Sequence, residues 1–268
     1  MAYYVGIDIG SQSTKCVVIN QNGDIVGFSL VPMGGSVERA SERAFRGALE
    51  QGKVQEVNVA RVIATGYGRK MARMADGQFT EIICHARGCY HLMPGIRTLI
   101  DIGGQDSKVI HLSKNGSVGR FVMNDKCAAG TGRFLEVMAR ALECDLSEMG
   151  ARALRAKNRV AVSSICTVFA ESEVISLLAT GVDVNDVIRA IAEAVANRTV
   201  MLVHRIGLEP PVAMSGGVAK NEGVVYALEE ILGVSIKVLS TAQLVGALGA
   251  ALMGRDEVEG LDRFKTIK

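Results

Sequence analysis

The stretch Leu99-Ile100-Asp101-Ile102-Gly103-Gly104-Gln105-Asp106-Ser107-Lys108-Val109-Ile110 repeats a pattern that begins 93 residues earlier, near the start of the chain. Each copy has an apolar strand that carries an Asp, then a polar turn with glycine, then a second strand. The repeat matches Asp8 to Asp101, Gly10 to Gly103, Gln12 to Gln105 and Lys15 to Lys108. A period this long excludes a solenoid. It predicts two related α/β lobes, each presenting an Asp and a set of turn amides toward a shared cleft.

Apolar alternation and turn signals predict the elements around the first copy. The expected elements are a strand from Tyr3 to Ile9, a polar turn from Gly10 to Lys15, a strand from Cys16 to Asn20, a hairpin turn at Asn22-Gly23, a helix from Val37 to Gln51, a strand from Arg61 to Ala64, an unassigned loop from Thr65 to Arg69 and a helix from Cys84 to Met93. Because Pro94 ends that helix, we place residues 1–95 in an N-terminal lobe, completed by a C-terminal helix at 250–268. Residues 96–249 form the second lobe.

The second lobe is expected to hold most of the helices. The expected elements are a helix after Gly130-Thr131-Gly132, a strand from Arg159 to Ile165 that runs into Cys166, a helix after Cys166, a long helix from Val182 to Ile206, a strand from Val212 to Met214, a glycine turn from Ser215 to Asn221 that opens a helix, and a last helix from Ala242 to Met253. The last helix is rich in Gly and Ala, which allows close approach of a neighbouring backbone.

Composition excludes several classes of protein. The chain has 268 residues, 49% of them hydrophobic, so it can bury a sizeable core. No apolar run approaches the roughly 20 residues that span a bilayer, and no secretion signal is recognisable, so we expect a cytoplasmic protein without membrane contact. A net charge of +2, an aromatic content of 4% and the absence of Trp argue against nucleic-acid binding.

The segment from Asn124 to Phe134 places Cys127 ahead of a helix, with Gly130-Thr131-Gly132 at the turn. The first amides of a helix lack partners within the helix, and we therefore expect unpaired N–H groups at this turn. Such groups favour a phosphate beside the glycines and a thiolate at Cys127, because both carry negative charge. One segment could therefore contact both a nucleotide and a redox centre.

Six cysteines without a compact spacing predict reduced thiols rather than a disulfide framework. Cys127 and Cys166 each precede a helix, and each is either a metal ligand or a buried structural thiol. We expect Cys16 and Cys144 to be structural. Four further side chains could form a zinc site, namely Cys84, His85, Cys89 and His91. Because Cys84 and His85 are adjacent in sequence, they are poorly placed to converge on one tetrahedral ion.

Two Asp-x-Gly turns in matched register, followed by Gly216-Gly217 after a strand, favour phosphate binding over ordinary turn chemistry. Neither the P-loop nor the dinucleotide Gly-x-Gly-x-x-Gly pattern is present. These turns resemble the phosphate and adenosine elements of the actin, sugar kinase and heat-shock chaperone ATPase superfamily. The resemblance implies an α/β, two-lobed actin-like fold with duplicated ribonuclease H-like lobes and a nucleotide cleft between them.

The same resemblance implies roles for single residues. Asp8 and Asp101 would hold Mg²⁺ through water or orient the attacking water, and Gln105 would position that water. The nucleotide would contact Gly10, Ser11, Gln12, Ser13, Thr14 and Lys15 from one lobe, and Gly103, Gly104, Gln105, Gly130, Thr131, Gly132, Gly216, Gly217, Val218 and Asn221 from the other.

A narrower resemblance rests on the segments from Asn124 and Ser163, together with Ile100-Asp-Ile-Gly-Gly-Gln-Asp106, Ala64-Thr-Gly-Tyr-Gly-Arg69 and Cys84-His-Ala-Arg-Gly88. They are similar to the activators of 2-hydroxyacyl-CoA dehydratases and to the ATPase subunits of benzoyl-CoA reductases. The family implies a homodimer, or a heterodimer with a related subunit, in which Cys127 and Cys166 of both chains hold one 4Fe-4S cluster. It also implies ATP and Mg²⁺, a ferredoxin or flavodoxin as electron donor, and an acyl-CoA dehydratase or aryl-CoA reductase as acceptor.

Two other functions remain open on the sequence alone. A small-molecule kinase of the same superfamily would phosphorylate a substrate as a colourless monomer. An ATP-gated binding protein would change its partner affinity with nucleotide and transfer no electron. Iron analysis of protein purified without oxygen separates both from an electron-transferring ATPase.

Overall fold

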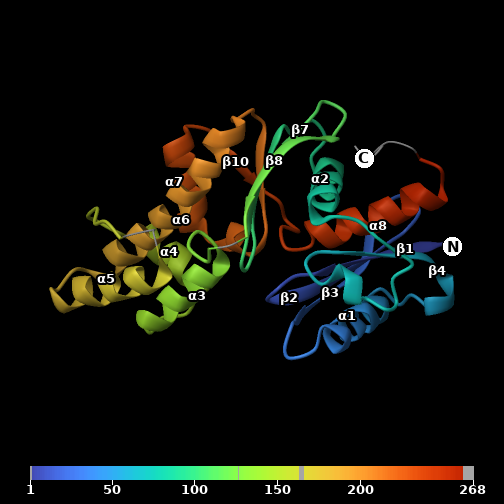
Figure 1. Cartoon of the computed structure of the whole chain (residues 1–268), viewed down its shortest axis with the longest axis horizontal. Helices are drawn as coiled ribbons and strands as arrows, with labels where there is room; N and C mark the ends of the chain where they lie inside the picture. The colour runs from blue at the N-terminus through green and yellow to red at the C-terminus, as the bar shows by residue number, and fades with distance from the viewer. Residues whose placement is uncertain (1, 126, 163–165, 262–268) are drawn as a thin grey trace. The chain divides into compact units, whose positions relative to one another are not determined.

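The computed structural model describes residues 2–125, 127–162 and 166–261. The chain divides into two compact units, drawn mainly in blue and red and mainly in green to orange (Figure 1). The first unit comprises residues 1–96, 112–119 and 243–268, and the second comprises 97–111 and 120–242.

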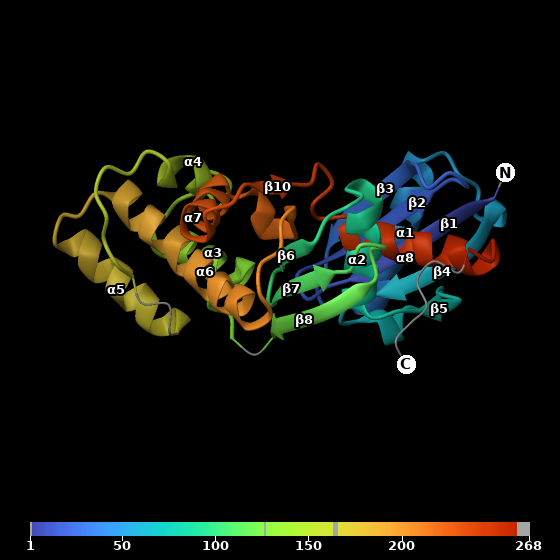
Figure 2. The same cartoon turned by 90° about the horizontal axis from the view of Figure 1, so that it is seen from above.

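A five-stranded mixed sheet forms the centre of the first unit, in the order β3-β2-β1-β4-β5. Its strands are β1 (Tyr3–Ile9), β2 (Ser13–Ile19), β3 (Ile25–Pro32), β4 (Val59–Thr65) and β5 (Gly77–Gln78). The helical elements of this unit are α1 (Val37–Gln51), η1 (Glu56–Asn58), η2 (Arg69–Met71), α2 (Glu81–Leu92) and α8 (Val245–Val258). Helix α1 packs on β1, β2 and β3, whereas α8 packs on β1, β2 and β4 and also against α2 (Figure 2).

Alternation along β1 explains these two layers, since successive side chains of a strand point to opposite faces. Val5, Ile7 and Ile9 enter the core under α1, which includes Ala44 and Phe45. Tyr4 enters the separate core with the α8 residues Ala247, Leu248 and Ala251. Asp8 shares the parity of Tyr4 and therefore lies on the α8 face of the sheet.

Helices α2 and α8 approach each other closely because α8 carries glycines at the crossing. A methyl group at Gly249 would lie 1.7 Å from the Cys84 carbonyl oxygen of α2, so no larger residue fits there. A buried ion pair reinforces the crossing, in which Arg87 Nε donates to Asp256 Oδ2 at 2.9 Å. The position of α2 relative to α8 is therefore fixed by both shape and charge.

The second unit repeats the sheet order, as β10-β9-β6-β7-β8. Its strands are β6 (Thr98–Ile102), β7 (Ser107–Leu112), β8 (Val118–Asn124), β9 (Val212–Ser215) and β10 (Ile236–Val238). Its helices are α3 (Gly132–Ala141), α4 (Met149–Ala153), α5 (Thr167–Ala179), α6 (Val184–Ile206), η3 (Gly217–Lys220) and α7 (Glu222–Leu232). A single core joins the sheet residues Ile100, Ile102 and Met214 to side chains of these helices.

The repeat seen in the sequence is present in the pairing of the strands. In the first unit, Asp8 lies opposite Lys15 on β2 and opposite Thr65 on β4. In the second unit, Asp101 lies opposite Lys108 on β7 and opposite Ser215 on β9. The prediction of two related α/β lobes is confirmed, and the prediction of a helix from Val37 to Gln51 is confirmed to the residue.

Some expected boundaries are wrong by a few residues. Strand β2 begins at Ser13 and not at Cys16, because pairing with β1 continues through Thr14 and Lys15. Helix α2 begins at Glu81, one turn before Cys84, with Thr80 at its N-cap position. Helix α8 covers Val245–Val258 rather than Ala242 to Met253. The helix expected at 250–268 therefore begins earlier and ends at Val258, and residues 262–268 lie outside the described residues.

The strand expected from Arg159 to Ile165 is wrong over residues 159–162, which form no strand, and residues 163–165 lie outside the described residues. The chain just before it is held elsewhere. The backbone N–H groups of Lys157 and Asn158 both donate to Asp186 Oδ1, in the first turn of α6. These bonds hold the start of the segment against α6.

Candidate functional site

Asp101 is buried at the end of β6, where two side chains fix its carboxylate. Ser215 donates to Oδ1 at 2.6 Å, and Lys108 donates to Oδ2 at 3.1 Å. Lys108 also contacts Asp106, at 2.5 Å. Both oxygens of Asp101 therefore have protein partners, and Ser215 and Asp106 are contributors that the sequence interpretation did not assign. The signal for Ser215 was the pairing of β9 with β6, which only the fold reveals.

Asp8 has the same place at the end of β1 but a looser environment. Its nearest cation, Lys15 Nζ, is 3.6 Å from Oδ2, beyond ordinary hydrogen-bond distance. The hydroxyl of Thr65, the counterpart of Ser215, donates instead to the Phe79 carbonyl oxygen at 3.0 Å. Asp8 is thus better placed than Asp101 to exchange a protein contact for a water molecule bound to Mg²⁺, whose preferred ligands are oxygens.

The loop from Thr65 to Arg69, which the sequence left unassigned, is the counterpart of the Ser215-Gly216-Gly217 turn. Gly66 and Gly216 follow equivalent strands and have φ values of 84° and 89°. A methyl group at Gly66 would lie 2.5 Å from Asp8 Oδ1, and one at Gly216 would lie 2.2 Å from the Ile102 carbonyl oxygen. Both positions require glycine, because an L side chain would be strained and would collide.

The two polar turns are accessible in their own units. Ser11 and Gln105 are exposed, and Gly103 and Gly104 are partly exposed. Thr14 differs, because it lies opposite Ile9 and is fully buried, so its side chain is on the α1 face of the sheet, away from Asp8. The structure brings Lys15, but not the Thr14 side chain, beside Asp8.

The amides at the start of α3 are not unpaired, which corrects the expectation from the sequence. Gly132 N–H donates to the Gly103 carbonyl oxygen and Arg133 N–H donates to that of Gly104, each at 2.8 Å. Ser107 donates to the Gly130 carbonyl oxygen at 2.6 Å. The expectation failed because tertiary contacts supplied partners from a turn far away in sequence. These bonds instead join the Gly103-Gly104 turn to the segment that follows Cys127.

The late glycine turn has mixed roles. Val218 is buried in the core of the second unit, and Asn221 caps α7 by accepting from Val224 N–H at 3.1 Å. Gly216 and Gly217 are the parts of this turn that remain candidates for direct nucleotide contact.

Cys127 and Cys166 are the candidate metal ligands, and the structure places them ahead of two helices that pack together. Cys166 is the N-cap residue of α5, Cys127 precedes α3, and α3 packs against α5. Both thiols are free and partly exposed. They therefore suit a cluster held between two chains, since a four-iron cluster takes four thiolates and each chain offers two.

The other thiols are less suitable as ligands. Cys16, Cys84 and Cys89 are buried. Burial raises the pKa of Cys84 to about 12 and raises that of Cys16 as well, so both stay protonated at neutral pH. Among the described residues, no group of three or more His, Cys, Asp or Glu side chains is placed to hold a metal ion within one chain.

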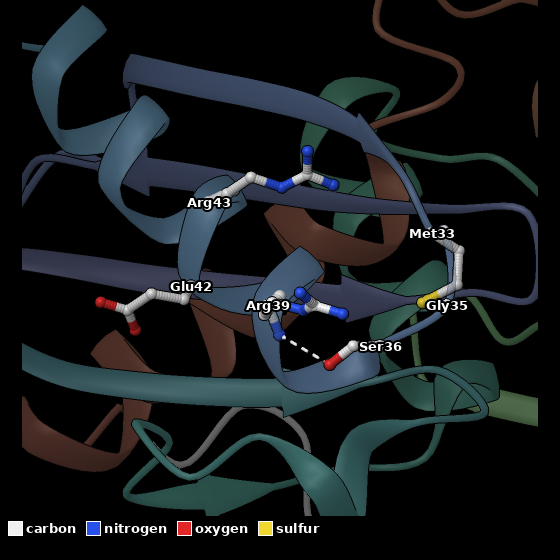
Figure 3. A pocket seen from close by; sticks show the side chains of 7 residues that line it. Met33, Gly35, Ser36, Arg39, Glu42 and Arg43 are labelled. Carbon is white, nitrogen blue, oxygen red and sulfur yellow. Dashed lines mark hydrogen bonds between the residues drawn. The ribbon is translucent and has the colours of Figure 1, made fainter.

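A hollow lies at the start of α1, between that helix and the loop after β3 (Figure 3). It is lined by Met33, Gly34, Gly35, Ser36, Arg39, Glu42 and Arg43. None of the residues that the sequence assigned to a site lines this hollow.

In the described part of the chain, no helix combines the length and the apolar composition that a membrane span requires.

The sequence profile of the BadF/BadG/BcrA/BcrD ATPase family matches residues 5–254. The chain is 49% identical over 251 residues to the (R)-2-hydroxyglutaryl-CoA dehydratase activating ATPase of Acidaminococcus fermentans, which covers 93% of this chain and 96% of that protein. It is 32% identical over 275 residues to one of the proteins that make up the benzoyl-CoA reductase of Thauera aromatica, which covers 98% of this chain and 97% of that relative.

Solved structures agree with these relatives. Component A of the A. fermentans dehydratase has a TM-score of 0.93 at 47% identity, covering 97% of this chain and 100% of that one. The activator of 2-hydroxyisocaproyl-CoA dehydratase from Clostridium difficile, solved with bound ADPNP, has a TM-score of 0.92 at 44% identity, covering 99% of both chains. A ROK family glucokinase from Streptomyces griseus has a TM-score of 0.60 at 15% identity and covers 95% of this chain and 100% of that one, which shows a shared fold alone. The predicted actin-like ATPase fold is confirmed.

Proposed function

Because the chain belongs to the BadF/BadG/BcrA/BcrD ATPase family, we propose that it hydrolyses ATP to drive single-electron transfer to a 2-hydroxyacyl-CoA dehydratase. Its 49% identity to a dehydratase activating ATPase, against 32% to a component of a benzoyl-CoA reductase, favours a dehydratase as the acceptor. The observation that carries the proposal is the set of hydrogen bonds that joins the Gly103-Gly104 turn to the start of α3, just after Cys127.

In this proposal the nucleotide binds at the two Asp-bearing turns. Lys15 and the amides of the Gly10–Gln12 turn contact the phosphates from the first unit, and the Gly103–Gln105 turn contacts them from the second. Asp8 holds Mg²⁺ through water, while Asp101 keeps Lys108 and Ser215 in place. Gln105, exposed at its turn, orients the attacking water. The Gly216-Gly217 turn receives the adenosine.

Cys127 and Cys166 from each of two identical chains are the proposed ligands of one 4Fe-4S cluster, with a reduced ferredoxin or flavodoxin as donor. When bound, such a cluster accepts and releases one electron at a time. A symmetric pair of chains is needed, because each chain supplies two of the four thiolates. A related ATPase chain could take the place of the second copy if it carries the same two cysteines.

The chain's own residues couple the nucleotide to the cysteines. A nucleotide can shift a conformational equilibrium only through different affinity for the two states. A phosphate that moves the Gly103-Gly104 turn also moves the first residues of α3, because two 2.8 Å hydrogen bonds connect them. Raising an electron by about 0.3 V requires about 7 kcal/mol, so this coupling must transmit a substantial part of the free energy of ATP hydrolysis.

Protein purified without oxygen tests the proposal. We expect a brown dimer that contains iron and hydrolyses ATP, and that activates a 2-hydroxyacyl-CoA dehydratase only with both a reductant and MgATP. Formation of the dehydrated acyl-CoA is the readout. Iron-free, monomeric protein that phosphorylates a small molecule would favour the kinase alternative. Nucleotide-dependent partner binding without electron transfer would favour the ATP-gated binding protein, and activation of an aryl-CoA reductase alone would favour the benzoyl-CoA reductase system.

Ser107→Ala should uncouple hydrolysis from electron transfer. Ser107 is 3% exposed and fixes the Gly130 carbonyl oxygen, so its loss loosens the segment between the Gly103-Gly104 turn and Cys127. We expect stability to fall by about 1–2 kcal/mol, from one lost buried hydrogen bond, and electrons delivered per ATP to fall severalfold while iron content is unchanged. The matched control is Ser113→Ala, in the exposed turn after β7. Unchanged electron delivery per ATP in Ser107→Ala would argue against this connection.

A further inference from the structure

The carboxylate of Asp8 lies beside Gly246 of α8, a residue without a side chain. A methyl group at Gly246 would be 3.1 Å from Asp8 Oδ2 and 2.8 Å from His85 Nε2. One glycine therefore separates a carboxylate oxygen of β1 from an imidazole nitrogen of α2. All three residues belong to the first unit.

His85 is held firmly in this position. Its side chain is 7% exposed, on the helix α2 that crosses α8 at Gly249. The neighbouring residue Cys84 makes the close backbone contact at this crossing. The Arg87–Asp256 pair anchors the same turn of α2. The imidazole near Asp8 therefore belongs to a rigid element and not to a loop.

The two units differ in what supports the carboxylate of the strand-end Asp. In the second unit, Ser215 on β9 fixes the carboxylate of Asp101 at 2.6 Å. In the first unit, the equivalent residue Thr65 directs its hydroxyl to Phe79. The carboxylate of Asp8 lacks that support from β4, and its Oδ2 and the imidazole Nε2 of His85 both lie beside Gly246.

We propose that His85 is a positioning residue of the ATP site, which holds the carboxylate of Asp8 in the orientation that receives a Mg²⁺-bound water. This inference rests on the proposed function, because it takes Asp8 as the magnesium-facing carboxylate. Without the imidazole, Oδ2 is free to turn toward Lys15, now 3.6 Å away. That rotation favours a direct ion pair over a water-bridged metal and removes Lys15 from the phosphates.

Three variants test this role. His85→Leu removes the polar nitrogen at similar volume, and His85→Gln keeps an N–H donor. Gly246→Ala keeps both polar residues but crowds them, because the added methyl group would lie 2.8 Å from His85 Nε2 and displace it. Gly47→Ala on α1 is the matched control, since its added methyl would meet Ser29 only at an ordinary 3.4 Å. Thermal unfolding of each variant reports whether the first unit is intact.

The readouts are the affinity for a non-hydrolysable ATP analogue with and without Mg²⁺, measured by calorimetry, and the kcat and KM of ATP hydrolysis. Loss of a residue that orients a metal-facing carboxylate typically costs about 10–100-fold in metal affinity or activity. We expect His85→Leu and Gly246→Ala to lose about tenfold of the strengthening that Mg²⁺ gives to nucleotide binding. Affinity without Mg²⁺ should change little, the KM for MgATP should rise in step with the lost Mg²⁺-dependent affinity, kcat should fall, and His85→Gln should recover most of the loss.

The outcomes separate this inference from the proposed function. If Asp8→Asn abolishes the strengthening of nucleotide binding by Mg²⁺ but His85→Leu retains it, the proposed role of His85 is wrong. The assignment of Asp8 to the ATP site is then unaffected. If His85→Leu and His85→Gln are equally impaired and equally unstable, His85 is structural and the inference also fails. If the wild-type chain binds no nucleotide, both are overturned.

Discussion

Cys166→Ser protein purified without oxygen should contain less than about one tenth of the iron of the wild-type protein, and should deliver no electron to a dehydratase. The change removes one of two proposed ligands per chain, and therefore two of four in a symmetric dimer, which leaves too few thiolates for a four-iron cluster. Cys127→Ser should have the same effect. Iron per chain, the visible absorption spectrum and the mass in solution are the measurements.

Cys144→Ser is the matched control, because Cys144 is also free and only partly exposed. Its thiol has a pKa raised mainly by burial, and nothing in the proposal assigns it to the cluster. The control variant should keep wild-type iron content and dimer mass. A Cys166→Ser protein that assembles a normal amount of iron would remove Cys166 from the ligand set, and equal iron loss in Cys144→Ser would remove the distinction between these thiols.

Much of the fold could be predicted from the sequence because its signals are local. The repeat of the Asp-x-Gly turns predicts two related sheets, and the amphipathic pattern from Val37 to Gln51 predicts both ends of α1. The reason is that burial of one helix face and alternation along a strand act over a few residues. The lengths of β2 and α8 were less predictable, since strand pairing and helix packing extended or shifted them.

The parts that were not predicted depend on contacts between distant segments. The sequence predicted unpaired amides at the start of α3, but the carbonyl oxygens of the Gly103-Gly104 turn accept from them. It also predicted a strand over residues 159–162, but the backbone just before them is bonded to Asp186. Ser215 gained its role beside Asp101 from parallel pairing of β6 and β9. A sequence pattern indicates which residues can do chemistry, and the register of the sheet decides which of them meet.

Asp8→Asn should lower the kcat of ATP hydrolysis by about 10–100-fold, the range for loss of a group that supports a metal ion from its outer shell. The amide keeps the shape of the side chain but loses the negative charge that attracts a hydrated Mg²⁺. Because Lys15 is 3.6 Å away and partly exposed, its charge is only weakly compensated by Asp8, and stability should change little. Asp24→Asn, on the exposed hairpin after β2, is the control for a lost carboxylate in the same unit.

Asp101→Asn should behave differently, although the two residues are equivalent in the repeat. Lys108 is 2% exposed, and its pairing with Asp101 is one of two acidic contacts. Breaking a buried ion pair costs about 3–5 kcal/mol, and we expect the lower end of this range because Asp106 remains beside the ammonium group. Urea unfolding of both variants, beside their rates of ATP hydrolysis, makes the comparison. Wild-type hydrolysis by Asp8→Asn would contradict the assignment of Asp8 to the chemistry. Equal destabilisation by the two changes would contradict the assignment of Asp101 chiefly to holding Lys108 and Ser215 in place.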